Sequence, residues 1–252
     1  MYGKIIAGSL GIAMMALTFQ PGAQAANVHI LDAVLNEKAA TNEVSTNEMR
    51  RIMQSGGAIV VDTRSRAEFE AGHIPGAKNL DAPAAGQLSA MQRMTGGDKT
   101  KPLVLYCNGP FCQASRRLAD KLVKDGYINV RRYQLGMPVW RALGGQIAIE
   151  TGGLRRIVGR DATAVLIDVR EREDFRKGTL PNALNAPVAE FLAGKFKKLP
   201  LPEDDFNRRI VIFGASAKQA RSLADFMTKR PWHNVVYFNG AYADAAGTLA
   251  AR

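Results

Sequence analysis

Short apolar runs alternate with amphipathic segments along most of the chain. The runs 58–62 and 103–106 are too short for helices, and they suit strands that are buried on both faces of a sheet. A third strand is expected at 130–133. Helical spacing of apolar positions predicts helices at 45–53, 66–71 and 115–125. Because strands alternate with helices, the pattern predicts an α/β fold with a small parallel sheet flanked by helices.

The pattern occurs twice. Asp62 and Arg64 recur as Asp168 and Arg170, at an offset of 168 − 62 = 106 residues. Further matches at or near that offset extend over about 100 residues, which indicates two consecutive copies of one domain. We place the first domain at 45–150 and the second at 151–252, with a glycine-containing breaker at 151–153 between them.

The N-terminal residues have a different character. Residues 1–25 carry one charge, an apolar stretch and the sequence Ala-Gln-Ala at 23–25, which predicts a secretory signal peptide cleaved after Ala25. The apolar stretch is shorter than the roughly 20 residues that span a bilayer, so we expect no stable membrane insertion after cleavage. The predicted location is the periplasm of a bacterium. Residues 26–44 form an N-terminal extension.

Composition narrows the function classes. The 252 residues carry 34 Lys and Arg against 23 Asp and Glu, a net charge of +11, which favours anionic ligands. We expect no nucleic-acid partner, because basic and aromatic residues are not interleaved. Two cysteines and three scattered histidines predict neither a disulfide scaffold nor a metal site, and no cofactor is expected.

The chemistry is expected in the loop after the second strand. Cys107 follows that strand directly, and backbone N–H groups of a Gly/Pro loop before a helix favour a thiolate. Arg117 adds positive charge further on. Cys107 is therefore the candidate nucleophile, although a buried structural cysteine is the alternative. The candidate loop and substrate-binding residues are Asn108, Gly109, Pro110, Phe111, Cys112, Gln113, Ala114, Ser115 and Arg116.

These motifs together resemble a rhodanese domain. The resemblance rests on Asp62-x-Arg64, on Gly-His-Ile-Pro-Gly-Ala at 72–77, on Val-Leu-Tyr-Cys at 104–107, and on Leu135-Gly136 followed by Trp140. It spans about 45–147, and the second half is more weakly similar. The resemblance implies a tandem sulfurtransferase in which Cys107 takes sulfane sulfur from a small anion such as thiosulfate or polysulfide. The resulting persulfide passes sulfur to a thiol, cyanide or protein acceptor. Asp62, Arg64 and His73 are expected to be structural residues near the site.

Three features depart from the family pattern. We expect the helix to begin near Ser115, which makes the loop two residues longer than the family's cysteine plus five residues. Cys112 is unusual at its position and is either a resolving thiol or a spectator. In the second copy, Gly214 stands where the nucleophile should be, in a loop that we expect to have the common length. The second domain is therefore predicted to be inactive.

Other functions remain open. A thiol–disulfide redox protein would use Cys107 and Cys112 as a pair, although their spacing is wider than Cys-x-x-Cys. A phosphatase would need an arginine close behind the cysteine, and Arg116 is nine residues away. A non-catalytic module that binds sulfur compounds or anions would fit the second half better than the first.

Overall fold

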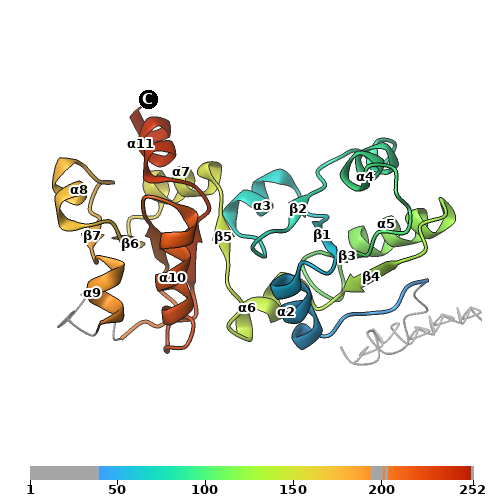
Figure 1. The fold of residues 1–252 in the computed structure, drawn as a ribbon, viewed down its shortest axis with the longest axis horizontal. Helices are drawn as coiled ribbons and strands as arrows, with labels where there is room; N and C mark the ends of the chain where they lie inside the picture. Colours follow the sequence, from blue (N-terminus) through green and yellow to red (C-terminus); the bar gives the residue numbers. More distant parts are fainter. Residues whose placement is uncertain (1–39, 194–200, 202–203, 251–252) are drawn as a thin grey trace, which may run out of the picture. The chain divides into compact units, whose positions relative to one another are not determined.

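The computed structural model describes residues 40–193, 201 and 204–250 (Figure 1). The predicted signal peptide, and residues 26–39 of the predicted extension, lie outside this part of the chain. The last residues of that extension belong to the first domain, because Val44 is buried and its N–H donates to the Arg132 carbonyl at 2.7 Å. Among the described residues, no helix is both long and apolar enough to cross a membrane.

The first domain contains a parallel sheet in the order β2-β1-β3-β4. The predicted helices and strands are confirmed with small shifts at their ends. The strands are β1 (Ile59–Asp62), β2 (Lys78–Asn79), β3 (Leu103–Tyr106) and β4 (Val130–Tyr133), and the helices are α2 (Thr46–Ser55), α3 (Arg66–Ala71), α4 (Gln87–Thr95), α5 (Gln113–Lys124) and α6 (Gly136–Ala142). The sequence reading missed β2, α4 and α6, which have short or weak apolar patterns.

Helices cover both faces of this sheet. Alternate residues of β3 enter two apolar clusters: Leu103 and Leu105 pack with α4 and α5, whereas Val104 and Tyr106 pack with α2, α3 and α6. The four residues of β3 are fully buried. A strand covered on both faces has no need of alternating polarity, which explains its continuous apolar sequence.

The second domain repeats this arrangement around a parallel sheet in the order β5-β9-β8-β6-β7 (Figure 1). Its strands are β5 (Ala148–Ile149), β6 (Val165–Asp168), β7 (Leu184–Asn185), β8 (Ile210–Phe213) and β9 (Val235–Phe238). Its helices are α7 (Thr151–Arg160), α8 (Arg172–Lys177), α9 (Val188–Leu192), α10 (Ala217–Met227) and α11 (Tyr242–Ala250). The predicted fold class, two α/β units with parallel sheets, is confirmed.

The predicted boundary at residue 150 differs from the sheet pairing. β5 lies before that boundary, yet it pairs with β9 of the second sheet. The expected breaker at 151–153 is wrong, because these residues form the first turn of α7. A Cβ at Gly153 would lie 2.0 Å from the Glu70 carbonyl oxygen. The glycine therefore permits close packing of α7 on α3 and does not interrupt the chain.

Candidate active site

Cys107 lies at the carboxyl end of β3, beside the carboxyl end of β1. From β1 the chain continues to β2 on one side of β1, and then crosses to β3 on its other side. The carboxyl ends of β1 and β3 therefore mark the switch point of the sheet. Ligands of parallel α/β sheets bind at such points. The sequence prediction that Cys107 occupies this edge is confirmed.

The predicted loop length is wrong. α5 begins at Gln113, and Cys112 is its N-cap, with extended backbone angles of −76° and 115°. Five residues therefore separate Cys107 from the helix, which is the spacing that the resemblance to a rhodanese domain implies. The cause is a turn in which the Cys112 N–H donates to the Gly109 carbonyl at 3.0 Å and starts the helix two residues early.

The candidate loop residues differ in exposure. Cys107 is only 4% exposed, whereas Phe111, four residues further along the loop, is 62% exposed. Among the other predicted residues, Gly109 and Ser115 are buried, Pro110, Cys112, Ala114 and Arg116 are half-buried, and Asn108 and Gln113 are exposed. The sulfur therefore sits under a loop whose outer side is open to solvent.

Cys107 and Cys112 are joined by a disulfide bond, with their Cα atoms 6.1 Å apart. The bond links the end of β3 to the start of α5, a helix of 12 residues without an acidic side chain in its first turn. The disulfide therefore lies at the N-terminal end of this helix, where the helix dipole is positive. In this state neither thiol is free, so chemistry at Cys107 requires prior reduction.

Asp62 and Arg64 form a buried ion pair, as expected. Arg64 Nη2 lies 2.6 Å from Asp62 Oδ2 and also donates to the Gly72 carbonyl at 2.8 Å. Asp168, Arg170 and Gly178 repeat these contacts in the second domain. Because the pair is present in both the cysteine-containing and the cysteine-free copy, its common role is structural.

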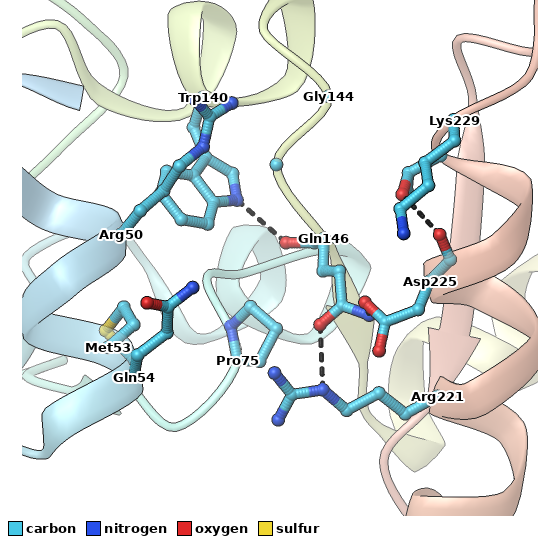
Figure 2. A pocket seen from close by; sticks show the side chains of 12 residues that line it. Arg50, Met53, Gln54, Pro75, Trp140, Gly144, Gln146, Arg221, Asp225 and Lys229 are labelled. Atoms are coloured by element: carbon cyan, nitrogen blue, oxygen red, sulfur yellow. Dashed lines mark hydrogen bonds between the residues drawn. The ribbon is translucent and has the colours of Figure 1, made fainter. Parts of the chain in front are cut away.

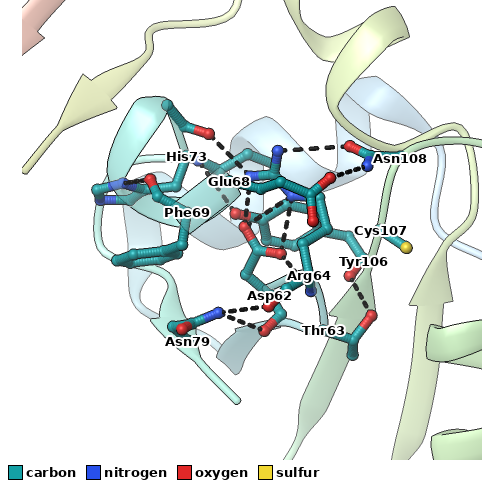
Figure 3. Close-up of polar contacts among 12 residues, drawn as sticks. Asp62, Thr63, Arg64, Glu68, Phe69, His73, Asn79, Tyr106, Cys107 and Asn108 are labelled. Atoms are coloured by element: carbon teal, nitrogen blue, oxygen red, sulfur yellow. Dashed lines mark hydrogen bonds and ion pairs between the residues drawn. The ribbon is translucent and has the colours of Figure 1, made fainter. Parts of the chain in front are cut away.

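A contact that the sequence reading missed connects this pair to the loop (Figure 3). Asn108 Oδ1 accepts a hydrogen bond from Arg64 Nη1 at 3.4 Å, and Asn108 Nδ2 donates to Glu68 Oε1. Glu68 also completes a capping box with Ser65 at the start of α3. The hydrogen bonds from Ser65, with a further one from Asn108, lower the pKa of Glu68. An anionic Glu68 thus fixes the first residue after Cys107.

Tyr106 is a second missed residue. Its hydroxyl bonds to Asp62 and accepts from the Ile74 N–H at 3.2 Å. Burial and the Asp62 carboxylate raise the pKa of Tyr106 well above its ordinary value, so the phenol stays protonated. Figure 3 shows the Cys107 sulfur pointing away from this polar network. The network therefore supports the base of the loop and does not contact the sulfur.

His73 is 1% exposed and has a structural position, as predicted. Its Nδ1 lies 3.0 Å from the Phe69 carbonyl, and its ring stacks on Phe69 with the centroids 3.8 Å apart. Its backbone pairs with Ala148. Burial lowers the pKa of His73, so the neutral imidazole is favoured in the folded protein. Trp140 is a packing residue as well, since it is 4% exposed within the apolar core and its indole N–H donates to the Gln146 carbonyl at 2.7 Å.

Gly136 allows the loop to pack against the start of α6. The Met137 N–H donates to the Cys107 carbonyl at 3.1 Å. A Cβ at Gly136 would lie 2.3 Å from that carbonyl oxygen and 2.5 Å from the Gly109 nitrogen, and Gly136 has a φ of +62°. The sequence reading noted Gly136 only as part of a motif, and the structure gives it a steric role beside Cys107.

The corresponding loop of the second domain is shorter than predicted. Residues 214–216 separate β8 from α10, so the expectation of a common length is wrong. The Gln219 side chain fills the space, because its Oε1 accepts from the Ala215 N–H at 2.8 Å. A Cβ at Gly214 would lie 2.7 Å from both Gln219 Oε1 and Val169 Cγ2. This edge has neither a thiol nor room for one.

A pocket of about 330 Å³ is lined by residues of α2, α6 and α10 and of the segments beside them, among them Arg50, Arg221 and Lys229, but by no residue of the Cys107 loop (Figure 2). Within the part of the chain that the structure describes, no three His, Cys, Asp or Glu side chains form a group that could hold a metal ion. The loop remains the candidate active site.

Comparison with known families gives a direct match. The model described as Rhodanese-like domain matches residues 45–143 and 153–247. The chain belongs to the rhodanese-like family. The two matches confirm the tandem arrangement that the internal repeat predicted. They also end the first domain before β5, in agreement with the sheet pairing.

Individual relatives match one domain at a time. The HTH-type transcriptional regulator Rv0324 of Mycobacterium tuberculosis is 33% identical over 40% of this chain and 42% of its own length. Thiosulfate sulfurtransferase GlpE of Pseudomonas savastanoi is 30% identical over 38% of this chain and 83% of its own length. This chain therefore spans less than half of the regulator but most of the GlpE protein. The match to GlpE supports a sulfurtransferase family.

A solved structure of a thiosulfate sulfurtransferase from Pseudomonas aeruginosa is 17% identical. It covers 84% of this chain and 43% of its own chain, with a TM-score of 0.38.

Proposed function

We propose that this protein transfers sulfane sulfur through a persulfide on Cys107. The observation that carries the proposal is the position of Cys107, at the carboxyl end of β3 and six residues before the first residue of α5, in a rhodanese-like domain. The partial positive charge of the helix N-terminus favours a thiolate there. The relatives named thiosulfate sulfurtransferase support the same chemistry.

The donor is proposed to be a small anion such as thiosulfate or polysulfide. With thiosulfate, the Cys107 thiolate attacks the outer sulfur, the S–S bond of thiosulfate breaks, and sulfite leaves with the electron pair. The new persulfide keeps a negative charge, which the loop N–H groups and the end of α5 stabilise. An acceptor such as cyanide, a thiol or a protein then attacks the outer sulfur and restores the thiolate.

The second domain is proposed to be catalytically inactive. Gly214 replaces the nucleophile, and the Gln219 side chain occupies the short loop behind it. The predicted periplasmic location rests on residues 1–25, outside the described part of the chain, and stays a prediction.

The test is the intact mass of the protein before and after a sulfur donor. The protein is first reduced, because the disulfide blocks Cys107. Addition of thiosulfate or polysulfide should give a species about 32 Da heavier, and Cys107→Ser should abolish it. Cyanide should then remove the added mass and yield thiocyanate. If both thiols are free and no donor adds mass, the proposal fails and a binding module remains.

A thiol–disulfide redox protein is the second candidate, and the disulfide between Cys107 and Cys112 favours it. Such a protein would exchange its disulfide with external dithiols and would never gain sulfur. In the same mass experiment it would alternate between a reduced form and one about 2 Da lighter. The two functions therefore differ in whether the species about 32 Da heavier forms at all.

A further inference from the structure

We propose that Cys112 is a resolving thiol that discharges the Cys107 persulfide as free sulfide. This inference rests on the proposed function, because it begins from the persulfide. It adds a second outcome to the reaction: the sulfur leaves as sulfide without any external acceptor, and the protein is left as the Cys107–Cys112 disulfide.

The loop geometry brings the two sulfurs into bonding contact. Cys107 and Cys112 are the first and last residues of the loop between β3 and α5, and a disulfide joins them. The turn closed by the Cys112 N–H and the Gly109 carbonyl folds the loop back on itself. The attack therefore requires no rearrangement of the sheet or of α5.

The position of Cys112 also supports reactivity. Residues that cap helices are usually Ser, Thr, Asp or Asn, whereas Cys112 caps α5 and makes no side-chain capping bond. A thiolate at this end of a 12-residue helix is stabilised by the partial positive charge of the helix. Cys112 thus has the environment of an attacking thiol more than that of a helix cap.

The step balances without an added oxidant. The Cys112 thiolate attacks the inner sulfur of the persulfide, which is Cys107 Sγ. A bond forms between the two Sγ atoms, and the bond between Cys107 Sγ and the outer sulfur breaks. The outer sulfur leaves with the electron pair as hydrosulfide, which carries the proton lost from the Cys112 thiol. An external dithiol must then reduce the disulfide before the next turnover.

Exposure indicates which sulfur the external dithiol reaches. Cys107 is 4% exposed, whereas Cys112 is half-buried and follows Phe111, which is 62% exposed. The dithiol therefore attacks Cys112 Sγ and releases the Cys107 thiolate. The helix N-terminus stabilises this leaving group.

The experiment is a single turnover without reductant. The full chain, its Cys112→Ser variant and its Cys112→Ala variant are reduced, freed of reductant under anaerobic conditions, and treated with thiosulfate or, in parallel, with polysulfide. Small molecules are then removed. Sulfide is measured over time, and the intact mass is followed in the same sample. Two replacements of Cys112 are used because Ser caps helices well and Ala does not.

In the wild-type chain, the species about 32 Da heavier should decay into one about 2 Da lighter as one sulfide per chain appears. Both Cys112 variants should keep the heavy species and should release sulfide at least roughly tenfold more slowly than the wild-type chain. Persistence of the heavy species in the wild-type chain would overturn the inference and leave the proposed function intact. Absence of that species from both Cys112 variants with both donors would overturn the proposed function and, with it, the inference.

Discussion

Arg64 connects the buried carboxylate of Asp62 to the loop that begins at Cys107, because Arg64 Nη1 lies 3.4 Å from Asn108 Oδ1. The same pair exists in the second domain as Asp168 and Arg170. There, the loop residue after Gly214 is Ala215, whose methyl side chain cannot accept such a hydrogen bond. One structural motif thus acquires a contact with the loop in the copy that carries the cysteine.

Asn108→Ala should slow persulfide formation roughly tenfold, because the loop loses its contacts with Arg64 and Glu68. The cost in free energy of unfolding should be about 1 kcal/mol. Asn79→Ala is the matched control, since Asn79 Nδ2 donates to the Asp62 and Arg64 carbonyls away from the loop. The rate of persulfide formation, followed by intact mass in samples quenched at several times, should fall only for Asn108→Ala. If both variants form the persulfide at the same rate, Asn108 does not position the loop.

Arg64→Ala and Arg170→Ala should each lower the free energy of unfolding by about 3–5 kcal/mol, because each leaves a buried carboxylate without its partner. Urea denaturation measures this cost. Under conditions where both variants are folded, only Arg64→Ala should slow the reaction of Cys107. A slower reaction in Arg170→Ala would show that the loss follows stability and not the loop contact.

Gly136→Ala should disrupt the loop, because its Cβ would clash with the Cys107 carbonyl oxygen. Gly56→Ala is the control for backbone strain alone. Gly56 has a similar φ of +66°, but no atom lies within 4 Å of its Cβ position. Gly56→Ala should cost about 1–2 kcal/mol with normal activity. Gly136→Ala should cost more and lose sulfur transfer. Normal transfer in folded Gly136→Ala would contradict the steric role.

The stability of the protein should fall as the pH drops below about 6.5. Burial lowers the pKa of His73, so below its ordinary value of 6.5 the unfolded chain binds a proton that the folded chain excludes. The stabilisation is fully present above that value and is lost as the pH falls toward the folded pKa. His73→Asn should flatten this part of the profile, measured by denaturation at several pH values. If the slope of the free energy of unfolding against pH stays the same in His73→Asn, the pH dependence comes from other groups.

Gly214→Cys should not create a second active site. The added side chain would meet Gln219 and Val169, and the loop of residues 214–216 is three residues shorter than the loop 107–112. In a Cys107→Ser background, Gly214→Cys should gain no sulfur from thiosulfate, with or without Gln219→Ala. A gain of about 32 Da in either variant would show that the short loop suffices.

The sequence by itself determined the repeat, the main strands and the place of Cys107 at the end of a strand. Asp62 and Asp168 recur at a fixed offset, and the strand before Cys107 is continuously apolar because both of its faces are buried. The strand and the cysteine at its end are local features, visible in a few consecutive residues, and the repeat is visible in the sequence alone.

Only the tertiary structure decided the lengths of the two loops, the pairing of β5 and the link from Glu68 to Asn108. The start of α5 at Gln113 depends on a turn at Gly109, and the short loop of the second domain depends on Gln219 filling its space. β5 belongs to the second sheet because it pairs with β9, which lies about 90 residues further along the chain. The pairing of β5 with β9 and the hydrogen bond from Asn108 to Glu68 join residues that are distant in sequence, which no local pattern encodes. The two loop lengths depend on contacts over three or four residues, which the pattern of hydrophobic and polar positions does not encode either.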